Sequence, residues 1–223
     1  MPSSYVASSP DGSRPGVFYL NTAALKSGGS AMISPSLFLH EAIPGHHWQI
    51  ALQREHKALP IFRKFASYNA FVEGWALYTE GLGQEMGIYQ NRRERLGMLA
   101  NELFRAVRLV VDVGIHDKGW TRQQAIDYML TTVGGSQEGA EREVERYMAW
   151  PGQALGYKIG QLKILEIRNK AEKMLGAAFD IRAFHDELLQ DGALPLNILE
   201  AKMDQWIAAQ SPHNPPAPQA DTR

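Results

Sequence analysis

The chain has 223 residues, of which 44% are hydrophobic and 21% charged, and its formal net charge is -1. This balance is typical of a globular protein and predicts neither nucleic-acid binding nor attraction to an anionic membrane surface. The sequence contains no cysteine, which excludes disulfides, thiolate metal sites and a cysteine nucleophile.

The first elements of the chain carry no targeting signal. Residues 1–16 have neither a basic segment nor an apolar core of the signal-peptide type, so any such signal would have to lie upstream. No apolar run approaches the ~20 residues that a membrane-spanning helix needs. The compartment therefore stays unknown, with cytoplasm and periplasm equally compatible.

The remaining elements predict a mainly α fold with a short β element near the N-terminus. Residues 1–30 are rich in Ser, Gly and Pro, and contain one β-like run, Val17–Leu20. Ser34 followed by Pro35 is typical of a helix start and leads into His40 and Glu41. Further helices are predicted over residues 61–85, 91–116, 121–130, 137–148, 157–175, 180–190 and 195–210.

These elements predict one domain over residues 1–210. The tail at residues 211–223 holds four of the 12 prolines and is predicted to be disordered. No internal repeat is apparent in the sequence.

Three of the seven histidines, His40, His46 and His47, fall within eight residues. In the H-E-x-x-H pattern the second histidine follows the first by four residues on one helical face, and the glutamate is the general base. Here that position is Pro44, which cannot bind a metal. Because Pro44 and Gly45 continue a helix poorly, a local bulge could bring His46 or His47 beside His40, and we favour His46. A buried or capping histidine pair is the alternative.

A carboxylate for the same site occurs 27 residues after His46, at Glu73. Glu73 and Glu80 share one helical face among apolar residues, which suggests that they point into a pocket, although a solvated acidic face is the alternative. We therefore expect His40, His46 and Glu73 to form a metal site with an open fourth position. Two imidazoles and a carboxylate favour zinc.

A polar stripe follows on an otherwise apolar helix at Arg105, Arg108, Asp112 and His116. Unpaired buried charge is costly, so the stripe predicts either a structural ion-pair network or a functional surface. In the second case Asp112 would orient a ligand histidine, and His116 or Arg108 would contact substrate.

Two tyrosines flank the predicted turn at residues 151–153. A phenol directed at a developing oxyanion complements a zinc ion, and we assign this role to Tyr157. We assign Arg146 and Tyr147 to substrate binding, with plain packing as the alternative for each. The edge of the front strand could pair with an extended peptide.

Five segments resemble a known family: DGSRPGVFYLN, HEAIPGHH, FVEGWALYTE, RLVVDVGIHDKGW and ERYMAWPGQALGYKIG. They look like the bacterial family called domain of unknown function 885, which is similar to the gluzincin metallopeptidases. In gluzincins two histidines and a glutamate from the following helix bind zinc. Family members are usually longer, so this chain resembles their C-terminal, metal-bearing portion without a helical N-terminal region.

The resemblance implies residue roles. His40, one of His46 and His47, and Glu73 would bind zinc, and Glu41 would be the base that activates a zinc-bound water. The fold it implies is a gluzincin-like helical metallopeptidase domain.

The expected function is a zinc-dependent hydrolase, foremost a peptidase, acting on a peptide or small amide. Glu80 would then be a partner of a ligand imidazole, or a structural charge. One alternative is a non-catalytic or incomplete domain that binds metal or peptide. Another is a metal-dependent amidase of non-peptide substrates, because a zinc-activated water is not restricted to peptides.

Overall fold

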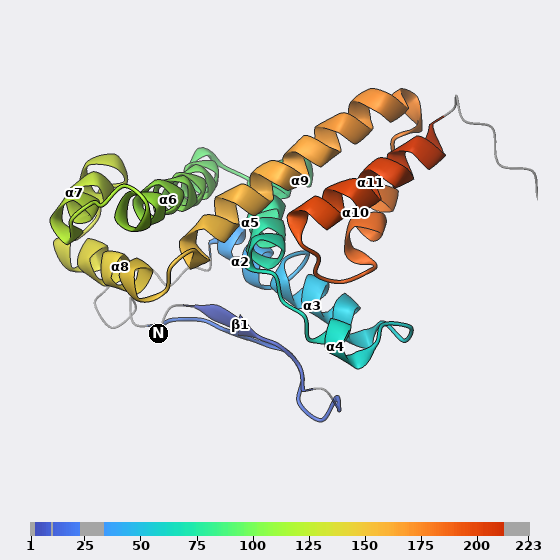
Figure 1. Cartoon of the computed structure of the whole chain (residues 1–223), viewed down its shortest axis with the longest axis horizontal. Coiled ribbons are helices and arrows are strands. Elements are labelled where there is room, and N and C mark those ends of the chain that lie inside the picture. The colour runs from blue at the N-terminus through green and yellow to red at the C-terminus, as the bar shows by residue number, and fades with distance from the viewer. Residues whose placement is uncertain (1–2, 10, 23–33, 212–223) are drawn as a thin grey trace, which may run out of the picture.

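The computed structural model of the chain describes residues 3–9, 11–22 and 34–211. This part is mainly helical, with one two-stranded antiparallel sheet near the N-terminus, which confirms the predicted fold class (Figure 1). Most of the predicted disordered tail, residues 212–223, lies outside the described residues. No helix in the described ranges has the length and hydropathy required to cross a bilayer.

The elements follow one another along the chain in a simple order. They are β1 (Ser4–Val6), β2 (Val17–Tyr19), α2 (Pro35–Glu41), α3 (His46–Glu55), α4 (Ile61–Lys64), α5 (Asn69–Glu85), α6 (Arg92–His116), α7 (Arg122–Thr132), α8 (Gln137–Ala149), α9 (Gln153–Leu175), the 3-10 turn η1 (Gly176–Ala178), α10 (Ile181–Leu189) and α11 (Leu196–Gln210).

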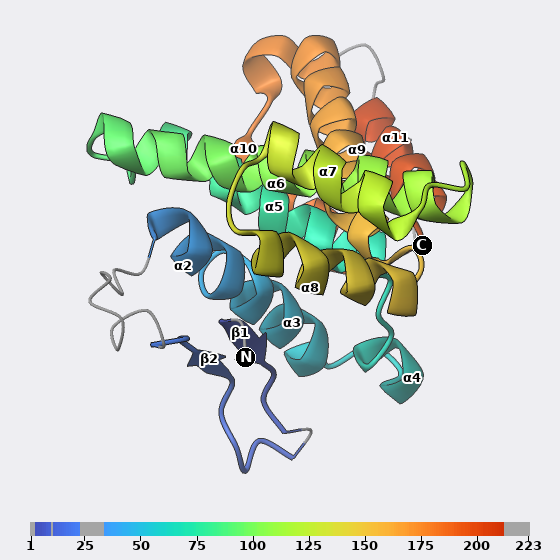
Figure 2. The same ribbon diagram turned by 90° about the vertical axis from the view of Figure 1, so that its left-hand side faces the viewer.

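The hairpin of β1 and β2 lies along the side of the molecule formed by α2 and α3 (Figures 1 and 2). Tyr5 stands opposite Phe18 in its register. Only the second strand was predicted from the sequence, because Val17–Tyr19 is an unbroken run of β-forming residues after a turn, whereas β1 begins with a serine and has no such run.

The predicted helix at residues 61–85 is wrong as a single element, because the chain breaks between α4 and α5. The Gln53 side chain on α3 donates to the carbonyl oxygens of Arg63 and Ala66, at 2.7 and 2.8 Å, and so satisfies polar groups that the break leaves open. The helix predicted from Tyr157 instead begins at Gln153, one turn earlier.

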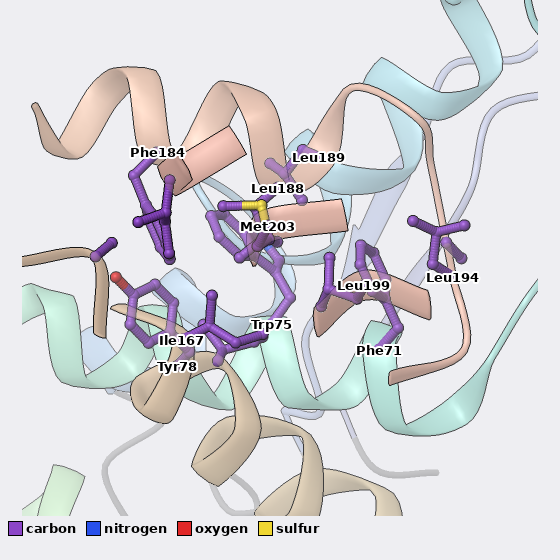
Figure 3. Close-up of a cluster of buried hydrophobic side chains, with 14 of the residues drawn as sticks. Phe71, Trp75, Tyr78, Ile167, Phe184, Leu188, Leu189, Leu194, Leu199 and Met203 are labelled. Atoms are coloured by element: carbon purple, nitrogen blue, oxygen red, sulfur yellow. The ribbon is translucent and has the colours of Figure 1, made fainter. Parts of the chain in front are cut away.

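Helices α5 and α9 cross at the centre of the fold. Gly74 and Gly160 meet at this crossing, where a Cβ on either would overlap the other helix. Around it, α5, α9, α10 and α11 enclose the larger hydrophobic cluster, in which Trp75, Phe184 and Met203 are fully buried (Figure 3). A second cluster joins α6, α7, α8 and the start of α9. The cavity described next is lined by residues of β1, α2, α3, α5, α6, α8 and α9.

Candidate metal centre

A break between α2 and α3 places two histidines side by side. Gly45 lies against the carbonyl of His40 so closely that no side chain would fit there. The Trp75 indole N–H donates to the Pro44 carbonyl at 2.8 Å and holds the break against α5. As a result the rings of His40 and His46 lie 4.8 Å apart between centroids and nearly perpendicular. The expected local bulge is thus a complete interruption between two helices.

Glu73 on α5 completes a cluster of three candidate ligands. Its Oε2 atom lies 3.3 Å from Nε2 of His46 and 3.8 Å from Nε2 of His40. The ligand atoms of these three residues all lie within 4.8 Å of one another. His47 points elsewhere, with Nδ1 3.1 Å from the Tyr5 hydroxyl of the hairpin. The structure therefore brings His46, and not His47, to His40 and Glu73.

The spacing and chemistry of this cluster fit a zinc ion. Zinc bonds of 2.0–2.1 Å in a tetrahedron imply ligand atoms about 3.3 Å apart, which the His46–Glu73 distance matches, whereas the His40–Glu73 distance is longer at 3.8 Å. Oε2 of Glu73 is buried and accepts no well-aligned hydrogen bond from the described residues, although the two imidazoles lie beside it. Ligand atoms that point toward one another and have few other partners are what a bound cation requires.

The electrostatics of the cluster also favour a cation. Burial alone would lower the pKa of His40, but the adjacent Glu73 and Glu80 raise it to about 9. Burial would raise the pKa of Glu73, yet His40 and His46 hold it well below its ordinary value. Each histidine thus faces a carboxylate that stabilises positive charge, whether a proton or a metal ion supplies it.

The second nitrogen of His40 is fixed by Glu80. Nδ1 of His40 lies 2.8 Å from Oε1 of Glu80, and both side chains are buried. A carboxylate in this position fixes the ring and leaves Nε2 directed at the cluster. Asp112, considered above for this role, instead accepts the backbone N–H of Gly152 at 3.1 Å.

A cavity of about 470 Å³ opens beside the cluster. It is lined by Ser3, Ser4, Tyr5, His40, Glu41, His46, Glu73, Phe104, Arg105, Arg108, Glu143, Arg146, Trp150 and Tyr157. Arg146, assigned to substrate binding from the sequence, lines the cavity, whereas His116 and Tyr147 do not. His116 is exposed, with Nε2 3.0 Å from the Tyr147 carbonyl, and Tyr147 is buried with its hydroxyl donating to Glu143 at 2.7 Å.

Glu41 lies in the wall of this cavity and is 8% exposed. Its Oε2 accepts the backbone N–H of Tyr5 at 2.8 Å. The outer edge of β1 therefore positions the carboxylate that the sequence assigns as the general base. This contact joins residues 36 positions apart, and no local pattern in the sequence indicates it.

Gln153 is a further residue of the site that the sequence did not indicate. Its amide nitrogen donates to Oε1 of Glu73 at 3.3 Å and to the Tyr157 hydroxyl at 3.2 Å. Its amide oxygen accepts from Arg108 at 3.0 Å and from Arg146 at 3.2 Å. Its position one helical turn before Tyr157 is the only signal that could have drawn attention to it.

Comparison with known proteins gives a family but no activity. The profile of the family described as "Bacterial protein of unknown function (DUF885)" matches residues 2–203. The crystal structure of a "putative lipoprotein" from Colwellia psychrerythraea has 48% sequence identity and a TM-score of 0.87, covering 93% of this chain and 36% of that one. A "putative lipoprotein of unknown function" from Shewanella oneidensis has 29% identity and a TM-score of 0.77, covering 90% of this chain and 38% of that one. This chain thus spans little more than a third of either relative, and no curated protein matches it significantly.

Proposed function

The chain belongs to this bacterial family of unknown function, and we propose that it is a zinc-dependent hydrolase of amide bonds, foremost a gluzincin-type peptidase. The observation that carries the proposal is the convergence of His40, His46 and Glu73 in a cavity that also contains Glu41 and Tyr157. Two histidines, one carboxylate and an open fourth position are a ligand set of catalytic zinc.

Zinc held by these three residues would supply a Lewis acid for a substrate carbonyl and an acidified water. Glu41 would take the proton from that water and deliver it to the leaving nitrogen. The N–H of Tyr5 holds one carboxylate oxygen of Glu41 in place for this transfer. Positioning of this kind is required because general bases act only within hydrogen-bond reach.

Tyr157 would stabilise the negative charge that develops on the carbonyl oxygen. Its ring lies nearly parallel to His40, with 6.2 Å between centroids. Burial and the nearby Glu73 carboxylate raise the pKa of its phenol, so the hydroxyl stays protonated at neutral pH and can donate a hydrogen bond.

The proposal is tested by measuring zinc content and peptide hydrolysis on the same preparations. We expect about one zinc per chain, loss of zinc in Glu73→Ala, and retention of zinc in Glu41→Gln with turnover reduced by about 10²–10⁴-fold. Gln has the volume of Glu and still accepts the Tyr5 N–H, so the site should stay assembled. His47→Ala is the matched control, because this neighbouring histidine points away from the cluster and its loss should leave zinc bound.

Absence of zinc after reconstitution, or full turnover in Glu41→Gln, would contradict the proposal. Normal zinc binding without cleavage of peptides or other amides would instead identify a metal- or peptide-binding domain without hydrolytic activity. Cleavage of non-peptide amides alone would identify an amidase.

A further inference from the structure

We propose that Arg105 and Arg108 bind a carboxylate group of the substrate. The hydrolase would then act on short substrates that carry a free carboxylate close to the scissile bond, such as the C-terminal residues of a peptide. The inference rests on the proposed function, because it names a substrate class for the same cavity. The observation behind it is that neither arginine has a carboxylate at ion-pair distance among the described residues.

Both arginines lie on α6, one turn apart, and line the cavity that contains the candidate metal ligands. Arg108 is only 4% exposed. The Nε atoms of Arg105 and Arg108 are buried and have no hydrogen-bond partner among the described residues. Within the same ranges no carboxylate lies at ion-pair distance from either guanidinium, and Arg108 meets the charge of Glu143 only at longer range, although buried arginines are normally paired.

The neighbours of these arginines hold their positions without neutralising their charge. The guanidinium carbon of Arg108 lies 4.1 Å from the centroid of the Tyr157 ring, and that of Arg105 lies 5.3 Å from it. Arg108 also donates to the amide oxygen of Gln153 at 3.0 Å. An aromatic face and a neutral amide orient a cation but leave it able to bind an anion.

Arg146, assigned to substrate from the sequence, is different. Its Nη2 lies 2.6 Å from Oε2 of Glu143, so its charge already has a partner inside the cavity. Zinc on His40, His46 and Glu73 would outweigh the single carboxylate among its ligands. Together with Arg105 and Arg108 it would still exceed the formal negative charge of Glu73, Glu80 and Glu41, so that the cavity keeps a small surplus of positive charge, which attracts an anionic substrate group.

A carboxylate fits these donors better than other parts of a peptide. A guanidinium presents a planar set of N–H groups that matches the two oxygens of a carboxylate. The volume of about 470 Å³ suits a ligand of small-molecule size. The carboxylate can come from the C-terminus or from an acidic side chain, and the experiment distinguishes these two sources.

The test is an affinity selection on the full chain carrying Glu41→Gln, which prevents cleavage. The probes are an equimolar library of N-acetyl dipeptides with all twenty C-terminal residues, and the same library as C-terminal amides, with retained peptides identified by mass spectrometry. The selection is made with zinc and again with a chelator, because a carboxylate can also bind the metal itself. We expect the free acids to be retained at least about tenfold better than the amides in both conditions.

Three variants, each added to Glu41→Gln, decide whether the arginines cause this preference. Arg105→Gln and Arg108→Gln should each reduce it by about tenfold. Arg142→Gln is the matched control, because this exposed arginine on α8 pairs with Glu138 on the surface and should have no effect. If Arg108→Gln does not fold, Arg105→Gln alone tests the inference, because Arg105 is only half-buried and its replacement should not prevent folding.

Equal retention of acids and amides whatever their side chains overturns the inference, as does an acid preference that the arginine variants leave unchanged or that vanishes with the chelator. Arginine-dependent retention of amides with Asp or Glu side chains supports the carboxylate site and assigns the carboxylate to a side chain. Selective retention without hydrolysis by the parent chain contradicts only the proposed function, whereas hydrolysis without selectivity contradicts only the carboxylate site.

Discussion

The two histidines of the candidate centre are held differently at the residue scale. His40 is hydrogen-bonded at Nδ1 by Glu80, and its Nε2 faces Oε2 of Glu73 at 3.8 Å. His46 faces Glu73 through Nε2, while its Nδ1 is buried and has no partner among the described residues. The geometry of the centre should therefore depend on the Glu80–His40 contact more than on the surroundings of His46.

Replacement of Glu80 by Gln tests that dependence. The amide cannot supply the negative charge that aligns and strengthens the imidazole, so we expect zinc affinity to fall by about 10–100-fold. The affinity is measured by competition with a chromophoric chelator. Glu85→Gln is the control, because Glu85 lies on the same helix but pairs with Arg168 away from the cavity. Unchanged affinity in Glu80→Gln would show that the contact is only structural.

Sequence spacing could predict candidates for the centre but not its completion. His40 and Glu41 stand out through their partial match to the H-E-x-x-H pattern, and Glu73 stands out because it shares a helical face with Glu80. Gln153 does not, because its role comes from contacts with residues 45 and 80 positions away. The choice between His46 and His47 likewise depended on the turn, which the sequence marks as a break without giving its path.

At the scale of elements, the crossing of α5 and α9 sets the position of Glu73. Gly74 follows Glu73 directly and packs on Gly160, where an added Cβ would overlap the Ala70 carbonyl. The helices can approach so closely only because both positions lack a side chain. The separation of α5 from α9 thereby fixes how far Glu73 reaches toward the histidines.

Gly160→Ala should force these two helices apart. We expect the free energy of unfolding to fall by about 1–3 kcal/mol, measured by urea denaturation, with weaker zinc binding because Glu73 moves with α5. Gly97→Ala is a matched control on α6, where an added Cβ meets nothing within 4 Å. That change should be neutral or stabilise the helix by up to about 1 kcal/mol. Equal effects of the two substitutions would refute the close-packing argument.

The boundaries of the elements show where local signals were sufficient. The helix predicted over 91–116 agrees closely with α6. Asn91 caps its start with a side-chain hydrogen bond, and asparagine is a residue type that the local sequence shows directly. The break between α4 and α5 was not predictable in the same way. Its open carbonyls are satisfied by Gln53, a contact across the tertiary structure.

At the scale of the whole molecule, the candidate ligands join regions of unequal packing. Glu73 lies on α5, which belongs to the larger hydrophobic cluster. His40 lies on the seven-residue α2, and His46 at the start of α3, whose only buried side chains are Gln49 and Gln53. A metal bound to all three would therefore tie the short helix α2 and the sparsely buried helix α3 to the core.

Zinc binding should accordingly stabilise the chain, and most strongly in those two helices. A ligand that binds only the folded state at 100 times its dissociation constant adds about 2.7 kcal/mol. We expect urea denaturation to show this gain in the wild type, and hydrogen exchange to show increased amide protection in α2 and α3 but little change in α11. Glu73→Ala should abolish both effects. An equal gain in that variant would mean that zinc stabilises the fold from another site, and the three residues would then no longer account for metal binding.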